Sequence, residues 1–146
     1  MIDLGYVLDT SLLAEMGRGD FGLIDLIATL DGRSVRMSVP ILALSVAAAH
    51  LHKEQRDLLA GALLLEHVEL DALSSIDDAA RLTLLVERLA DAPSERPSEL
   101  SVAHTAAVAR RLGWPVLTAD RKPWDAEVRP LLPWDLIVVD LQELDR

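Results

Sequence analysis

Residues 5–9, Gly-Tyr-Val-Leu-Asp, and residues 116–120, Val-Leu-Thr-Ala-Asp, carry the clearest structural pattern in this chain. Each segment is a short apolar run, typical of a buried parallel strand, and each ends in an aspartate. In an open α/β sheet, side chains at the carboxyl ends of parallel strands converge on a crevice where ligands bind. We therefore expect Asp9 and Asp120 to meet at one crevice, where two acids indicate a divalent cation or phosphate chemistry.

The composition predicts one domain over residues 1–146, because the chain is 51% hydrophobic and long enough to bury a core. Cysteine is absent, which excludes disulfides, zinc–thiolate sites and cysteine nucleophiles. The start of the chain lacks a signal-peptide pattern, and no apolar stretch approaches the roughly 20 residues that span a bilayer. We expect a cytoplasmic protein with no membrane partner.

The net charge of −10 argues against broad non-specific nucleic-acid binding, which relies on neutralisation of phosphates by Lys and Arg. The same charge leaves room for a local basic patch and for a basic protein partner.

Expected strands alternate with expected helices along the whole chain. The strands are 5–9, 34–39, 67–70, 116–118 and 136–141, and the helices are 10–16, 21–30, 41–52, 56–65, 76–90, 99–112 and 124–132. The helix at 41–52 is apolar almost all round, which predicts burial on every side. The alternation predicts an α/β protein, a three-layer α/β/α fold with a central, mostly parallel sheet and right-handed crossovers.

Two segments resemble the PIN domain family, which includes the VapC-like toxin ribonucleases. Residues 6–13, Tyr-Val-Leu-Asp-Thr-Ser-Leu-Leu, are similar to the opening strand of that family. Residues 106–120 are similar to its late helix, glycine turn and Thr-x-Asp strand end. The element order between them also matches, so the resemblance covers nearly the whole chain. It implies a Mg²⁺-dependent endoribonuclease of the toxin–antitoxin type, with RNA as substrate, an antitoxin protein as partner and a homodimer as assembly.

The resemblance also assigns the first and last acids of the site and the hydroxyl groups that support them. Such proteins use four acids to hold one or two Mg²⁺ or Mn²⁺ ions, which activate a water for attack on a phosphodiester. By motif, Asp9 is the first acid and Asp120 the last, so both are the implied catalytic residues and metal ligands. Ser11 matches the hydroxyl that supports the first acid, and Thr118 belongs to the Thr-x-Asp motif.

The second and third acids of the family are missing. Ser45 stands where the second, a glutamate, is expected, and Val102 stands at the position of the third. Because Mg²⁺ is often held by one or two carboxylates plus water and substrate phosphates, the two surviving aspartates could bind one ion weakly. Nearby side chains that could substitute are Glu99 and Asp125 as metal ligands and His104 as a proton shuttle or phosphate contact.

Each of these residues also has an ordinary structural interpretation. Asp9 can cap a helix, Asp120 can belong to a turn, and Glu99 and Asp125 can charge the starts of their helices. His104 can be satisfied by a local hydrogen bond.

Four basic residues flank the strand that ends in Asp120: Arg110, Arg111, Arg121 and Lys122. Since phosphate contacts come mainly from Arg and Lys, they are the best candidates for a nucleic-acid edge. Three functions therefore remain open. The chain is a weakly active metal-dependent ribonuclease, a PIN-fold protein with a degenerate site that binds nucleic acid or protein, or a structural protein with an unrelated α/β crevice.

Overall fold

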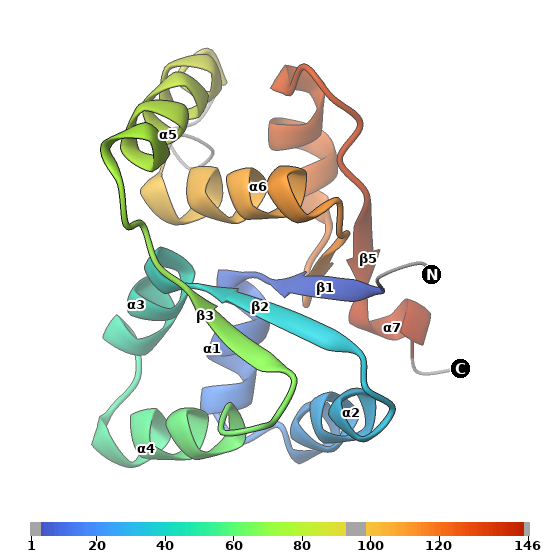
Figure 1. Cartoon of the computed structure of the whole chain (residues 1–146). Helices are drawn as coiled ribbons and strands as arrows, with labels where there is room; N and C mark the ends of the chain where they lie inside the picture. Colours follow the sequence, from blue (N-terminus) through green and yellow to red (C-terminus); the bar gives the residue numbers. More distant parts are fainter. Residues whose placement is uncertain (1–3, 93–98, 145–146) are drawn as a thin grey trace.

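A single parallel sheet forms the centre of the computed structural model, which describes residues 4–92 and 99–144. Within those residues the sheet has five strands in the order β3-β2-β1-β4-β5, and every pairing is parallel (Figure 1). The strands are β1 (Gly5–Leu8), β2 (Arg36–Pro40), β3 (Val68–Asp71), β4 (Val116–Thr118) and β5 (Val138–Asp140). The sequence prediction of an α/β fold with a parallel sheet is confirmed.

Helices cover both faces of the sheet, which gives three layers (Figure 1). On one face lie α1 (Thr10–Gly17), α2 (Phe21–Gly32), α3 (Ile41–Ala49) and α4 (Lys53–Ala62). On the other lie α5 (Ile76–Leu89), α6 (Leu100–Leu112), the π-helical turn η2 (Trp124–Val128) and the 3-10 turn η3 (Arg129–Leu131). The short helix α7 (Leu141–Leu144) follows β5. None of the helices described in the structure is both long and apolar enough to cross a bilayer.

The sheet separates two apolar cores because successive side chains of a strand point to opposite faces. Leu8 and Leu117 belong to the core beneath α1 to α4. Their neighbours Val7 and Val116 belong to the core beneath α5 and α6. Both faces of the central strands are therefore buried, which explains why these strands are apolar without alternation.

The prediction that the helix at 41–52 is buried on all sides is wrong. Helix α3 ends at Ala49, and its fully buried residues are Ala43 and Ala47, while Ser45 is exposed. Its inner face packs on α1 and α6, and its outer face meets solvent. Much of its apolar character comes from alanine. Leaving the single methyl group of an alanine exposed to water costs little free energy, because its apolar surface is small.

The C-terminal part of the chain is more broken than predicted. The expected helix at 124–132 is a π-helical turn followed by a 3-10 turn that contains Pro130, which cannot donate a backbone hydrogen bond. The expected strand at 136–141 is shorter, because Leu141 already begins α7.

The register of β1 and β4 brings the two aspartate motifs together. Leu8 pairs with Leu117, and the backbone N–H of Asp9 donates to the carbonyl of Leu117 over 3.3 Å. Before β4, Gly113 ends α6 with a left-handed φ of 70°, a conformation that glycine adopts without steric cost. The chain can thus turn directly from α6 into the strand that carries Thr118.

Candidate functional site

Asp9 lies at the junction of β1 and α1 and is nine-tenths or more buried, with 5% of its surface exposed. It is the N-cap of α1, and its Oδ1 accepts from the backbone N–H of Leu12 over 3.0 Å. The Ser11 hydroxyl donates to the same oxygen over 2.9 Å. Asp9 therefore caps α1, as its structural interpretation predicts. Its Oδ1 is occupied by two donors from that helix.

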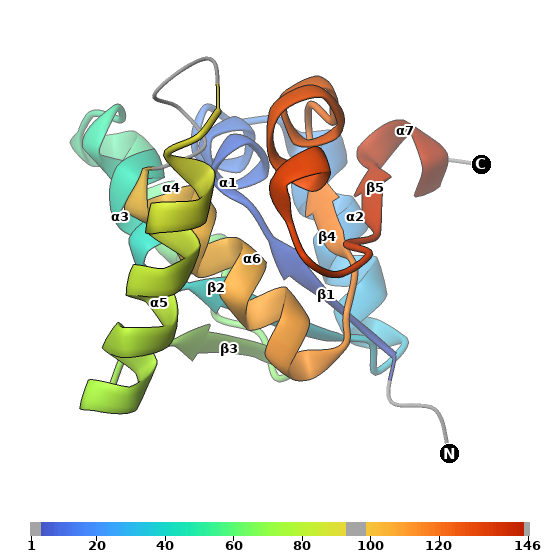
Figure 2. The same cartoon turned by 90° about the horizontal axis from the view of Figure 1, so that it is seen from above.

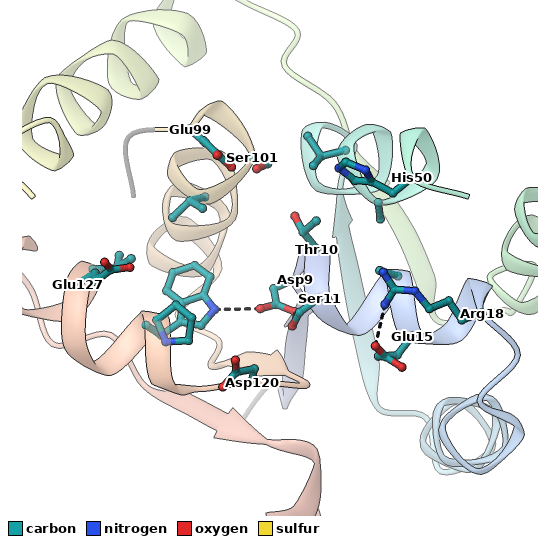
Figure 3. Close-up of a pocket in the computed structure, with 17 residues that line it drawn as sticks. Asp9, Thr10, Ser11, Glu15, Arg18, His50, Glu99, Ser101, Asp120 and Glu127 are labelled. Carbon is teal, nitrogen blue, oxygen red and sulfur yellow. Dashed lines mark hydrogen bonds and ion pairs between the residues drawn. The ribbon is translucent and has the colours of Figure 1, made fainter. Parts of the chain in front are cut away.

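The other carboxylate oxygen is held by the second motif. Thr118 Oγ1 donates to Asp9 Oδ2 over 2.6 Å. The indole Nε1 of Trp124 donates to the same oxygen over 2.9 Å, the contact drawn as a dashed line in Figure 3. A carboxylate offers about four lone-pair positions in all. With two donors on each oxygen, the acceptor capacity of Asp9 is fully used by protein groups.

Two opposing effects act on the charge of Asp9. Burial raises the pKa of its carboxyl group, because removal from water penalises the ionised form. The hydrogen bonds from Thr118, Leu12, Trp124 and Ser11 lower that pKa, although burial has the larger effect. The site thus holds a carboxyl group that is costly to ionise but surrounded by donors.

Thr118 connects Asp9 to the backbone of Asp120. Its Oγ1 accepts from the Asp120 N–H over 3.1 Å while its single proton is directed to Asp9. Ser11 has a matching role, because its hydroxyl donates to Asp9 and accepts from the backbone N–H of Ala119 over 3.2 Å. The two supporting hydroxyls predicted from sequence therefore lie beside Asp9 and join both strand ends.

A cavity of about 340 Å³ opens at these strand ends (Figure 3). The predicted site residues Asp9, Ser11, Glu99 and Asp120 all line it. Asp120 is exposed, and its Oδ1 accepts from the backbone N–H of Lys122 over 3.2 Å. The central prediction, that the two aspartates lie at one crevice, agrees with this arrangement.

The positions of the missing acids differ in their relation to the cavity. Val102 lines the wall at the place where the third family acid is expected, beside Ser101. Ser45 lies outside the lining, and its hydroxyl donates to the carbonyl of Ile41 within α3. Apolar and small side chains complete the wall: Ala14, Val46, Ala47, Pro123, Trp124 and Val128.

Asp125 and His104 lie away from the cavity lining. Asp125 accepts from Arg121 over 2.7 Å and from Arg129 over 2.8 Å, and these contacts lower the pKa of its carboxyl group. Its carboxylate is therefore part of an ion-pair network on the surface. His104 lines a separate cleft at the end of β3.

The four predicted nucleic-acid contacts are largely engaged within the protein. Arg121 pairs with Asp125 and Glu143, and Arg111 pairs with Asp71. The Arg110 guanidinium lies over the ring of Trp134, 4.5 Å from its centroid, while Lys122 is exposed. A phosphate backbone would have to compete with these internal partners.

Trp124, Glu127 and His50 also line the cavity, and none of them is among the predicted site residues. Trp124 is the most consequential, because its indole reaches Asp9 from a turn that begins four residues after Asp120. No spacing rule predicts this contact, since it depends on the direction in which the π-helical turn points the indole ring.

A metal ion at this cavity would be held by few protein ligands. Among the residues that the structure describes, no group of three or more His, Asp or Glu side chains could hold a metal ion. An ion on Asp9 would also have to displace a hydrogen-bond donor, because all its acceptor positions are in use.

Comparison with known proteins identifies the fold but no family. No protein-family model matches this chain, and no curated protein matches its sequence. Among solved structures it is similar to the crystal structure of PAE2754 from Pyrobaculum aerophilum, with a TM-score of 0.52 and 16% sequence identity. The match covers 98% of this chain and 93% of that one. At this level of identity the likeness concerns the arrangement of strands and helices.

Proposed function

We propose that this chain is a PIN-like protein with a degenerate acidic site, which has lost metal-dependent ribonuclease activity and acts by binding a basic protein segment at its crevice. The saturated carboxylate of Asp9 carries this proposal. A metal ligand must present a free lone pair, and each oxygen of Asp9 already accepts two hydrogen bonds. In this site the first acid of the PIN motif serves as a structural cap.

The cavity wall supports the same proposal. The position implied for the third acid is Val102, and the residue implied for the second, Ser45, is absent from the lining. Activation of a water and stabilisation of a leaving oxygen require closely placed charges that these side chains do not provide. The apolar wall is instead suited to the aliphatic part of a side chain from a partner.

The charge around the cavity favours a basic partner over RNA. Glu15, Glu99, Asp120 and Glu127 lie in the lining, against Arg18 and His50. Arg18 is paired with Glu15 over 2.7 Å. Together with the net charge of −10, this rim attracts Lys and Arg and repels phosphates. The resemblance to toxin–antitoxin proteins makes an antitoxin-like protein a reasonable partner class, and a homodimer in the cytoplasm remains a further prediction.

A weak Mg²⁺- or Mn²⁺-dependent endoribonuclease is the second candidate. The observation in its favour is that Asp9 and Asp120 line the same cavity as Glu99. For an ion to bind between the two aspartates, the indole of Trp124 or another donor has to leave Asp9.

Titration with Mn²⁺ separates the two candidates. We expect no saturable broadening of the NMR signals of Asp9 at millimolar Mn²⁺, and no metal-dependent cleavage of a structured RNA. Metal-dependent cleavage that disappears in Asp9→Asn would establish the ribonuclease and refute the proposal.

Binding is tested with a synthetic peptide of alternating leucine and arginine. We expect it to shift the NMR signals of the cavity residues, and the double change Glu99→Gln with Asp120→Asn to weaken it about tenfold, by removal of two charges. The double change Asp25→Asn with Asp77→Asn, which removes two exposed acids outside the lining, is the matched control. An equal loss in the control variant would assign the binding to net charge alone.

A further inference from the structure

A second cleft, of about 520 Å³, lies between the end of β3 and the helices α5 and α6. Figure 2 shows α5 and α6 on the same face of the sheet, and the two helices pack against each other. The polar side chains in the lining that concern us are His104 from α6, Asp71 from the end of β3, and Arg111. Neither the crevice at Asp9 nor the function proposed for it uses this cleft.

His104 is almost completely buried, with 1% of its surface exposed. Its Nδ1 accepts from the backbone N–H of Leu42 over 3.5 Å. Leu42 lies in the first turn of α3, where Pro40 provides no side-chain cap, so this N–H would otherwise lack an acceptor. An imidazole that accepts at Nδ1 carries its proton at Nε2 when neutral. Burial favours that neutral form by lowering the pKa of His104.

The proton at Nε2 has no acceptor within hydrogen-bond range. Of the buried side-chain polar atoms in the described residues, His104 Nε2 is the one without a hydrogen-bond partner. The Oδ1 of Asp71 lies 3.7 Å away, beyond the range of a direct hydrogen bond, while its Oδ2 pairs with Arg111. A buried donor thus faces a carboxylate oxygen across a short gap.

A hydroxyl group is the chemical group that satisfies both sides of this gap. Its oxygen can accept from Nε2–H, and its proton can be donated to Asp71 Oδ1. A carboxylate or phosphate oxygen could accept from His104 but would be repelled by Asp71. An ammonium group could donate to Asp71 but has no lone pair for His104.

The charges in the lining balance, which favours a neutral ligand. Asp71 and Asp78 are opposed by Arg81 and Arg111, and His104 is neutral. Apolar side chains stand beside them, including Leu70, Leu73, Leu82 and Val108. A single water occupies about 30 Å³, so the cleft has room for a molecule the size of a sugar ring.

We propose that this cleft binds a neutral polyhydroxylated compound, a sugar ring, with one hydroxyl bridging His104 Nε2 and Asp71 Oδ1. The shared chemistry can come from a free monosaccharide or from the ribose of a nucleoside. The probes are therefore D-glucose and uridine, each titrated into the full chain.

The Nε2 resonance of His104, observed by ¹⁵N NMR, reports the contact directly. We expect one of the two probes to shift it saturably, and Asp71→Ala to weaken that binding about tenfold, because the ligand hydroxyl then loses the carboxylate oxygen to which it donates. Asp77→Asn, on the same segment but outside the cleft, is expected to leave the affinity unchanged. Tetrahydropyran, the same ring without hydroxyls, is expected to leave the resonance unmoved.

Three results would overturn the proposal. The first is an unmoved His104 resonance with both glucose and uridine at concentrations of tens of millimolar. The second is an equal response to tetrahydropyran, which would show that the hydroxyls are not recognised. The third is a response to inorganic phosphate that exceeds both probes, which would show that the cleft selects an anion. Because all three use the unchanged protein, they do not depend on whether a variant folds.

Discussion

The indole Nε1 of Trp124 donates to Asp9 Oδ2 over 2.9 Å and so ties the turn after β4 to the end of β1, across 115 positions of sequence. Thr118, from β4 itself, donates to the same oxygen. Asp9 is therefore the point at which two distant segments and the first helix are joined. The same contacts that make it a structural residue remove it from the set of available metal ligands.

Replacing Trp124 by phenylalanine tests both the structural role of Asp9 and its unavailability as a metal ligand. The ring continues to fill the buried site, but one hydrogen bond to Asp9 is lost, so we expect the free energy of unfolding to fall by about 1–3 kcal/mol. The freed lone pair should also allow Mn²⁺ to broaden the NMR signals of Asp9, which we expect it not to do in the unchanged protein. Urea denaturation and Mn²⁺ titration measure the two effects.

Trp134→Phe is the matched control for this experiment. Trp134 packs with Arg110 and contributes no hydrogen bond to Asp9, so its replacement should leave the response to Mn²⁺ unchanged. If Trp124→Phe is as insensitive to Mn²⁺ as the control, occupancy by the indole is not what keeps metal from Asp9.

Thr118→Val removes the hydroxyl that joins Asp9 to the backbone of Asp120 while preserving the shape of the side chain. Asp9 then loses its shortest hydrogen bond, and the N–H of Asp120 loses its acceptor. We expect a loss of about 1–3 kcal/mol in the free energy of unfolding, measured by urea denaturation. Thr118→Ser retains the hydroxyl and should lose clearly less. Equal losses in both variants would attribute the effect to packing of the methyl group.

Much of the fold follows from sequence because its central strands are buried on both faces. Val7, Leu8, Val116 and Leu117 are all fully buried, so an unbroken apolar run identifies β1 and β4 without any need for alternation. The carboxyl ends of adjacent parallel strands must share an edge, which is why Asp9 and Asp120 could be placed at one crevice. Local rules were sufficient for both conclusions.

The state of the site depends on contacts that local rules do not reach. The indole of Trp124 points at Asp9 because of a π-helical turn, and His104 points away from the crevice because it caps α3. The outer face of α3 is exposed although its sequence is apolar, since no other element in the described part of the chain covers it. Each of these outcomes is set by tertiary packing, which periodicity and motif spacing do not encode.

The pH dependence of stability should reveal the burial of Asp9. Because burial raises the folded-state pKa above the ordinary value of 3.8, the folded protein binds this proton more tightly than the unfolded chain. The contribution of Asp9 to stability is thus fully present below the unfolded pKa, and it decreases as the pH rises through the raised folded pKa. Asp9→Asn cannot titrate, so this decrease should be missing from its stability profile.

The measurement is urea denaturation of both proteins between about pH 4 and pH 8. Asp9→Asn should be less stable overall, since its amide nitrogen cannot accept from the donors around it, by about 1–3 kcal/mol. The difference between the two proteins should be largest at the acid end and shrink as the pH rises. A difference that grows with pH would mean that the donors around Asp9 outweigh burial and lower its pKa.

Gly5, the first residue of β1, should not tolerate a side chain. A Cβ built there would lie 2.5 Å from the ring atoms Cδ2 and Cε2 of Trp114, closer than real contacts allow. Trp114 is buried and belongs to the core beneath α6, so a methyl group at Gly5 forces a packed indole ring to shift. We expect Gly5→Ala to lower the free energy of unfolding by about 1–3 kcal/mol, the usual effect of overpacking a dense core.

Gly32→Ala, at the end of α2, places its methyl group where no atom lies within 4 Å, and it should be neutral or slightly stabilising. Thermal unfolding of the two variants gives the comparison, and because β1 carries Asp9 at its end, Gly5→Ala should also shift the NMR signals of the crevice. A Gly5→Ala protein as stable as Gly32→Ala would mean that β1 and Trp114 are not packed as closely as these distances indicate.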